Sequence, residues 1–296
     1  MKYVTTKDMT TGEEIQLSCK DYGSGRPVVL IHGWPLSKEM WEYQIDALVN
    51  AGLRVIKYDR RGFGKSSKPW DGYDYDTLTD DLKAIMDQLD LRNATLVGFS
   101  MGGGEAVRYL SRYGTDRVSK IILVSSITPY MAKTNDNPDG VDQSVFAEMM
   151  QQMKEDRLDF LDSFGKKFFG VNVINRPVST PMLDYYRMLA SVALPRAVQQ
   201  CALSFAQTDF RHDVESVNIP ALVIHGDADK IVPIEAGGNR TAKLIPGCEY
   251  KVYDGAPHGL FYPYKEELNR DLIDFIQSGA QTGEAVSRET SANYNK

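Results

Sequence analysis

One serine in the chain lies in a local pattern that suits a nucleophile. Ser100 is the centre of Gly98-Phe99-Ser100-Met101-Gly102, which follows a short apolar run and precedes a helical segment. Glycines on both sides allow a strand and a helix to approach closely at a sharp turn. The serine then stands at the amino end of a helix, where free N–H groups favour a developing oxyanion. We therefore expect Ser100 to attack a carbonyl carbon.

A serine hydroxyl needs a base to remove its proton, and the chain has four histidines. His258 follows the last expected strand, in a turn that can bring its side chain over the same sheet edge, so we expect it to be the base. His32 comes too early in chain order and is expected to shape a loop. His225 ends a strand and is expected only to pack or hydrogen-bond, and His212 to be solvated or locally paired.

Two aspartates compete to orient the imidazole of His258 and stabilise its charged form. Asp227 and Asp229 both follow the expected strand at residues 221–224. Asp229 lies further into the loop and is the preferred carboxylate, whereas Asp227 is expected to hold the turn through its own backbone. The chain order Ser100, Asp229, His258 is that of the α/β-hydrolase fold.

An oxyanion needs two N–H donors. The first expected donor is the backbone of Met101, directly after the nucleophile. The second should come from the loop after the first central strand, His32-Gly33-Trp34-Pro35. Pro35 has no N–H, which leaves Trp34 as the expected donor. The Trp34 side chain has core packing as a competing interpretation.

The elements that must position these residues alternate between two patterns. Short apolar runs rich in Val and Ile are typical of strands buried on both faces, and they occupy residues 27–31, 53–58, 94–99, 120–124, 221–224 and 249–253. Stretches with helical spacing lie between them, as at residues 78–89, where Asp76 is the expected N-cap. The first twenty residues alternate around Thr11-Gly12, which indicates an antiparallel hairpin at a sheet edge. The pattern predicts an α/β-hydrolase fold, with a mostly parallel central sheet and helices on both faces.

The alternation stops between two of the core strands. Residues 128–218 are rich in Met and Phe and mainly helical, which predicts a helical cap inserted into a core made of residues 1–127 and 219–278. The last residues, 279–296, are small, polar and aperiodic, and we expect them to form a flexible tail.

Composition narrows the function classes. The chain has 296 residues and a formal net charge of -6, without a basic stripe, so we expect no nucleic-acid partner. Neither a leader peptide nor an apolar stretch of membrane-spanning length is evident, so we expect no membrane association and a cytoplasmic location. The three cysteines are far apart and lack metal spacing. They fit a reducing compartment, and we expect no disulfide, metal or cofactor.

Five segments together resemble the bacterial cofactor-free haloperoxidases and their relatives, the aryl esterases. They are residues 32–35, 58–67, 98–105, 225–233 and 253–259, and the likeness extends over about residues 12–277. The resemblance implies a metal-free esterase acting on small or aryl esters. It also implies perhydrolysis, in which hydrogen peroxide replaces water and a peracid is released.

The resemblance carries two further implications. In this family a proline after the oxyanion Trp accompanies better perhydrolysis, and Pro35 matches that position. Relatives form trimers or hexamers, so a homo-oligomer is expected.

We also expect five residues to contact the substrate: Pro35, Phe146, Phe164, Ile231 and Val232. Phe146 and Phe164 have the core of the cap as a competing interpretation.

These observations predict a serine carboxylic-ester hydrolase that works through an acyl-enzyme, with a small ester as substrate and hydrogen peroxide as a second co-substrate. A lactonase or amidase of the same fold, or a ligand-binding protein without turnover, are the alternatives. Epoxide and haloalkane hydrolases share the fold but use an Asp nucleophile, and Ser100 argues against them.

Overall fold

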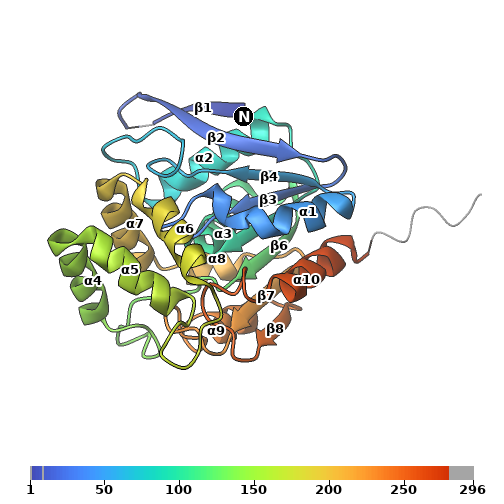
Figure 1. Ribbon diagram of the computed structural model, residues 1–296. Coiled ribbons are helices and arrows are strands. Elements are labelled where there is room, and N and C mark those ends of the chain that lie inside the picture. The colour runs from blue at the N-terminus through green and yellow to red at the C-terminus, as the bar shows by residue number, and fades with distance from the viewer. Residues whose placement is uncertain (1, 9, 280–296) are drawn as a thin grey trace, which may run out of the picture.

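Eight strands form one sheet in the order β1-β2-β4-β3-β5-β6-β7-β8 (Figure 1). The computed structural model describes residues 2–8 and 10–279. The strands are β1 (Lys2–Lys7), β2 (Glu14–Tyr22), β3 (Pro27–Ile31), β4 (Arg54–Tyr58), β5 (Ala94–Phe99), β6 (Val118–Val124), β7 (Ala221–Gly226) and β8 (Glu249–Tyr253). β1 pairs with β2, and β2 with β4, in antiparallel fashion, and all the other neighbours are parallel. The predicted α/β class and the edge hairpin are both confirmed.

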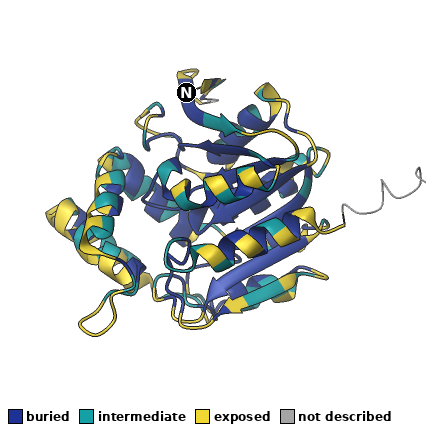
Figure 2. Cartoon of the chain, turned by 45° about the vertical axis from the view of Figure 1, so that its right-hand side comes forward, coloured by how far each residue is buried: buried dark blue, intermediate teal, exposed yellow. Residues whose placement is uncertain are grey.

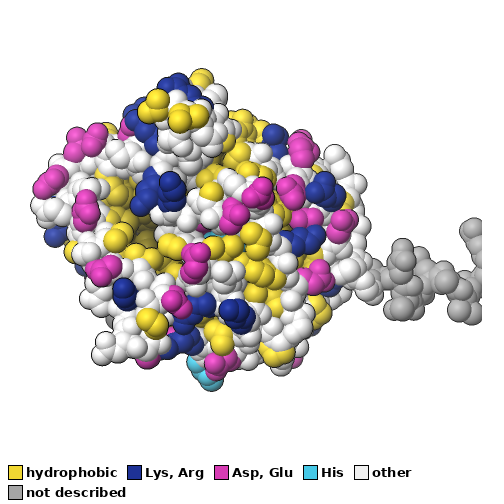
Figure 3. Space-filling view, turned by 90° about the horizontal axis from the view of Figure 1, so that it is seen from below, with side chains coloured by type: hydrophobic (Ala, Val, Ile, Leu, Met, Phe, Trp, Pro, Cys, Tyr) yellow, Lys and Arg dark blue, Asp and Glu magenta, His cyan; other side chains and the backbone are white. Residues whose placement is uncertain are grey.

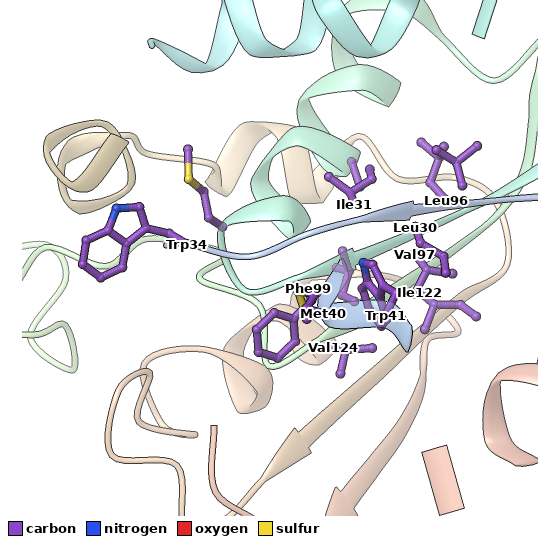
Figure 4. Close-up of a cluster of buried hydrophobic side chains, with 14 of the residues drawn as sticks. Leu30, Ile31, Trp34, Met40, Trp41, Leu96, Val97, Phe99, Ile122 and Val124 are labelled. Atoms are coloured by element: carbon purple, nitrogen blue, oxygen red, sulfur yellow. The ribbon is translucent and has the colours of Figure 1, made fainter. Parts of the chain in front are cut away.

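The central strands are apolar because both faces of the sheet are covered. Every residue of β3, β5 and β7 is buried. Leu30, Val97 and Ile122 lie on one face of the sheet, and Ile31 and Leu96 lie on the other (Figure 4). A buried parallel sheet therefore explains why the strands read as continuous apolar runs rather than as alternating ones.

Two helical layers cover the sheet (Figure 1). The helices are η1 (Lys38–Trp41), α1 (Glu42–Asn50), α2 (Tyr75–Gln88), α3 (Met101–Tyr113), α4 (Gln143–Glu155), α5 (Arg157–Phe168), α6 (Thr180–Ser191), α7 (Pro195–Gln207), α8 (Arg211–Glu215), α9 (Gly238–Leu244) and α10 (Lys265–Gln277). α1 contacts α10 in one layer, and α2, α3, α8 and α9 contact one another in sequence in the other. The helices are buried toward the sheet and exposed outward (Figure 2).

The start of α2 differs from the prediction. Asp74, not Asp76, is the N-cap: its backbone is extended and its carboxylate accepts a hydrogen bond from the N–H of Thr77. Asp76 lies in the first turn, where it binds Arg108 and Arg112. Both aspartates suit a helix start, and the choice depends on where the preceding chain turns.

Helices α4 to α8 all lie between β6 and β7 in the chain. α4 to α7 gather at one end of the sheet, on the left in Figure 1. That end is the carboxyl end of the parallel strands, because Trp34, just after β3, packs against Phe160, Phe164 and Phe205 of α5 and α7. Of the predicted tail, residues 280–296 lie outside the described residues. Within the described ranges, no helix is both long and apolar enough to cross a bilayer.

A buried ion pair ties α3 to the loop after β4. Glu105 of α3 is fully buried, and its Oε1 accepts a hydrogen bond from Arg60 Nε at 2.7 Å. Its Oε2 accepts one from the Tyr58 hydroxyl at 2.9 Å. Arg60 also donates to the carbonyl of His32 and, through its own N–H, to His32 Nε2. The pair thus fixes α3 relative to the loop that follows β3.

Glu105→Ala should lower the free energy of unfolding by about 3–5 kcal/mol, because it leaves the buried Arg60 guanidinium without its counter-charge. Glu215→Ala, at an exposed position of α8, is the matched control and should change stability by less than about 0.5 kcal/mol. Urea denaturation followed by circular dichroism measures both. A loss below about 1 kcal/mol for Glu105→Ala would show that the pair does not hold α3 in place.

Candidate active site

Ser100 lies on the tight turn between β5 and α3. Its φ of 52° and ψ of -118° place it in the left-handed half of backbone space, which strains a residue with a side chain. A Cβ at Gly98 would come within 2.5 Å of the Gly102 carbonyl oxygen, and a Cβ at Gly102 within 2.6 Å of the Ile31 carbonyl oxygen. Only glycine fits at these two positions. The turn has the geometry of a nucleophile elbow.

The structure brings Ser100, His258 and Asp229 together. The Nε2 of His258 lies 3.0 Å from Ser100 Oγ, and its Nδ1 lies 2.6 Å from Asp229 Oδ2. The three residues follow β5, β8 and β7, whose parallel strands end at the same edge of the sheet. They are 5%, 1% and 6% exposed, respectively. This is the arrangement that a serine, a base and an orienting carboxylate need for acyl transfer.

Asp227, the competing aspartate, faces a different partner. Its Oδ1 accepts a hydrogen bond from the N–H of Gly255 at 2.7 Å. Asp227 therefore holds the loop after β7 against the loop after β8. The loop after β8 also carries His258, three residues after Gly255.

Four donors surround the Asp229 carboxylate. Oδ1 accepts hydrogen bonds from the N–H groups of Ile231 and Val232, both at 2.8 Å. Oδ2 faces His258 Nδ1 and also His225 Nε2, at 3.3 Å. Burial alone would raise the pKa of Asp229, but the facing imidazole of His258 and the hydrogen bonds from His225 and His258 hold that pKa well below its usual value. Asp229 is therefore ionised at neutral pH.

His225 packs and hydrogen-bonds as expected, but one of its partners is the Asp229 carboxylate, which the sequence did not indicate. Its ring is fully buried, and Nε2 lies 2.9 Å from the Val232 carbonyl oxygen as well as close to Asp229. Both neighbours are acceptors, so Nε2 carries the proton. Its Nδ1 has no hydrogen-bond partner among the described residues. His225 thus shares its Nε2–H between the Asp229 carboxylate and the loop that carries Asp229.

Three further residues hold His258. The rings of Phe99 and Phe168 pack against the imidazole, with centroids 5.1 and 5.0 Å away. The hydroxyl of Ser125 donates to the His258 carbonyl oxygen at 3.2 Å. Phe168 comes from the end of α5, so the inserted helices contribute directly to the surroundings of the base.

The two expected oxyanion donors are the N–H groups of Trp34 and Met101. Neither donates a hydrogen bond to any of the residues that the structure describes. The hydroxyl of Tyr75 binds the Met101 carbonyl oxygen at 3.1 Å, and the Trp34 indole N–H binds the Val198 carbonyl oxygen at 2.9 Å. Burial, and then the adjacent Arg60 guanidinium, hold the pKa of His32 well below its usual value, so this loop carries a neutral histidine.

A pocket of about 480 Å³ lies beside the triad. Four of the five predicted substrate contacts line it: Phe146, Phe164, Ile231 and Val232. The side chain of Trp34 forms part of the same wall. Ser100 and His258 do not line the pocket. It adjoins the triad through Ile231 and Val232, whose N–H groups donate to Asp229. A hollow lined by hydrophobic side chains, with basic side chains beside it, is visible on the lower face of the molecule (Figure 3).

Pro35 lies outside this pocket. It lines a second, much smaller cavity of about 20 Å³, together with Phe168 and Tyr186. Phe164 lines both cavities and separates them. Sequence reasoning missed several residues of the main pocket, which are Ile127, Met131, Val141, Val145, Met149 and Phe160. Their apolar character was visible, but not the face of each helix that turns toward the site.

Over residues 2–8 and 10–279, no group of three or more His, Cys, Asp or Glu side chains has an arrangement that could hold a metal ion.

Comparison with known proteins gives the family. Residues 26–263 match the model of the alpha/beta hydrolase fold, which covers most of the chain. The chain therefore belongs to the α/β-hydrolase family.

Particular relatives agree with the predicted resemblance to haloperoxidases and esterases. Non-heme chloroperoxidase CPO-A1 of Kitasatospora aureofaciens is 44% identical over 269 residues, which are 90% of this chain and 98% of that protein. The bifunctional esterase/perhydrolase DCH of Acinetobacter calcoaceticus is 37% identical over 281 residues, 94% and 100% of the two chains. The crystal structure of a bromoperoxidase from Bacillus anthracis superimposes with a TM-score of 0.89 at 46% identity and covers 93% and 100% of the two chains.

His225→Leu should lower kcat/KM about tenfold, because Asp229 loses a contact that fixes the position from which it orients His258. His225→Gln should retain most of the activity, since its amide N–H can occupy the place of Nε2. In the Leu variant the acid limb of the kcat/KM profile should also move to higher pH, because a carboxylate with one donor fewer holds the imidazolium more strongly. Equal losses in both variants with an unmoved acid limb would assign His225 to packing alone.

Proposed function

We propose that this protein is a serine carboxylic-ester hydrolase that forms an acyl-enzyme on Ser100. The observation that carries the proposal is the contact of 3.0 Å between Ser100 Oγ and His258 Nε2, with Asp229 behind the ring. The names of the relatives, an esterase/perhydrolase and a non-heme chloroperoxidase, support acyl chemistry of this kind.

In the first step His258 Nε2 accepts the proton of Ser100 while the serine oxygen attacks the ester carbonyl carbon. The negative charge that develops on the carbonyl oxygen is bound by the N–H groups of Met101 and Trp34. The intermediate then collapses, and His258 donates its proton to the leaving alcohol. Asp229 stays ionised throughout and stabilises the imidazolium.

In the second step a small nucleophile resolves the acyl-enzyme. His258 takes a proton from water, and the hydroxyl oxygen attacks the acyl carbon. His258 then returns the proton to Ser100 Oγ as the bond between this oxygen and the acyl carbon breaks, which releases a carboxylic acid and free Ser100. When hydrogen peroxide takes the place of water, the same steps release a peracid. The peracid can oxidise halide away from the protein, which accounts for haloperoxidase names among the relatives.

The inserted helices act as the cap of the site in this proposal. Residues 128–218 form the cap, and residues 1–127 and 219–278 form the core. Phe146 and Phe164 of the cap line the same pocket as Ile231 and Val232 of the core, which supports the assignment. An ester would bind in this pocket and reach Ser100 past Trp34.

The proposal also covers the cellular location of the protein and its oligomeric state. Cys19 and Cys201 are buried free thiols, and burial raises the pKa of each to about 12. Inert thiols of this kind suit a reducing compartment, so we propose a cytoplasmic location. A trimer or hexamer stays a prediction, which light scattering after size-exclusion chromatography tests.

Ser100→Ala should lower the hydrolysis of p-nitrophenyl acetate by about 10⁴- to 10⁶-fold, because the members of a triad act as a unit. With hydrogen peroxide present, wild type should release peracid and the variant should not. Absence of turnover by wild type on acetate, butyrate and a panel of lactones would overturn the esterase proposal and favour a ligand-binding protein.

Pro35→Leu should lower the ratio of perhydrolysis to hydrolysis while ester hydrolysis continues. The physical reason proposed is that proline places a backbone carbonyl of this loop toward the peroxide, where it can accept a hydrogen bond. Parallel measurement of peracid and acid release from one ester gives the ratio. An unchanged ratio would remove Pro35 from the account of perhydrolysis.

A further inference from the structure

Two lysines from distant parts of the chain converge on the main pocket. Lys167 lies in the last turn of α5, and Lys230 lies in the loop after β7, between Asp229 and Ile231. Both side chains line the pocket and both are solvent-exposed. The cap and the core thus each place one ammonium group at its edge.

Neither lysine has a partner of opposite charge. Among the residues that the structure describes, no carboxylate oxygen lies within 4 Å of either ammonium group. The neighbouring Lys166, by contrast, pairs with Asp162 at 2.6 Å. The third charged residue of the lining, Glu148, accepts a hydrogen bond from Gln152 at 3.0 Å. Two lysines against one glutamate give the lining a net charge of +1, in a chain whose net charge is -6.

Most of the remaining pocket wall is apolar, and its other polar members are Gln152 and Ser163. Aromatic rings dominate it: Trp34, Phe146, Phe160, Phe164 and Phe205. An apolar pocket with a few convergent polar groups selects a ligand by its hydrophobic body and orients it through those groups. Here the convergent groups are two unpaired cations at the edge, so the complementary ligand has an apolar body and an anionic end.

We propose that the preferred substrates are esters with a carboxylate at the end remote from the ester bond, which binds between Lys167 and Lys230. The half-esters of apolar dicarboxylic acids and the acetates of carboxyphenols are of this class. The proposal rests on the proposed function, because it assigns a substrate class to the same site.

The test compares anionic esters with neutral ones of the same shape. On the acyl side, p-nitrophenyl hydrogen adipate is compared with the analogue in which a methyl ketone replaces the carboxylate. On the alcohol side, m-carboxyphenyl acetate is compared with m-acetylphenyl acetate. In wild type at least one anionic ester should have a kcat/KM about tenfold above that of its neutral partner, through KM.

Removing the charges should remove that preference. The double variant Lys167→Met, Lys230→Met should lower the ratio of anionic to neutral kcat/KM about tenfold, and Lys167→Glu should lower it further. Because each variant is read as a ratio, a general effect of altering Lys230 beside Asp229 cancels. Lys154→Met is the matched control: it removes the same charge from an exposed position of α4 outside the pocket, and it should leave the ratio unchanged.

Salt provides a second readout. The preference of wild type should largely disappear at about 1 M sodium chloride, where the screening length falls to about 3 Å. The neutral esters should respond little to salt.

The proposal is overturned if neither pair shows a preference for the anionic ester, or if the preference survives in the double variant. Turnover of the neutral esters that depends on Ser100 would then leave the proposed function standing. If no ester of either kind is turned over, the proposed function fails as well.

Discussion

The hydrogen bond between His258 and Asp229 is the interaction on which the rest of the site depends. It joins two loops that start from adjacent strands, β7 and β8, and it directs the other ring nitrogen toward Ser100 at the end of β5. The alignment follows from the sheet, because parallel strands in register bring their carboxyl ends to one edge. Asp229 can keep its charge in a buried place because it receives two backbone N–H bonds and faces two imidazoles. The fold thus brings together at one point the carboxylate, the imidazole and the hydroxyl of the proposed triad.

A second set of buried contacts fixes the loop of Trp34 opposite the serine. The Arg60–Glu105 pair links this loop to α3, the helix that begins directly after Ser100. The two expected oxyanion donors, Met101 and Trp34, therefore belong to segments that one ion pair holds together. Preorganised donors of this kind are favourable for catalysis because they need no rearrangement as charge develops.

The sequence predicted the core of the fold well because its signals are local. The apolar runs predicted the six parallel strands. The glycines around Ser100 predicted the tight turn, because only glycine leaves room for the Gly102 and Ile31 carbonyl groups. Local reasoning failed at the start of α2, where the expected cap was Asp76 and the turn of the preceding chain makes Asp74 the cap instead.

The inserted helices were harder to predict for a different reason. Phe164 faces the main pocket, whereas Phe168, one turn later on α5, packs on His258, and the pattern of apolar residues does not distinguish the two positions. The contact of His225 with Asp229 likewise depends on how the loop after β7 folds back on its own strand. Such contacts arise from tertiary packing, and spacing along the chain does not encode them.

Covalent labelling of the folded protein with a fluorophosphonate probe, followed by peptide mass spectrometry, tests the central claim most directly. The account predicts a single adduct on Ser100, formed rapidly by wild type and much more slowly by His258→Ala. Circular dichroism shows that the variant is folded. An unlabelled Ser100 in folded wild type, or an adduct on another residue, would contradict the claim that Ser100 is a nucleophile activated by His258.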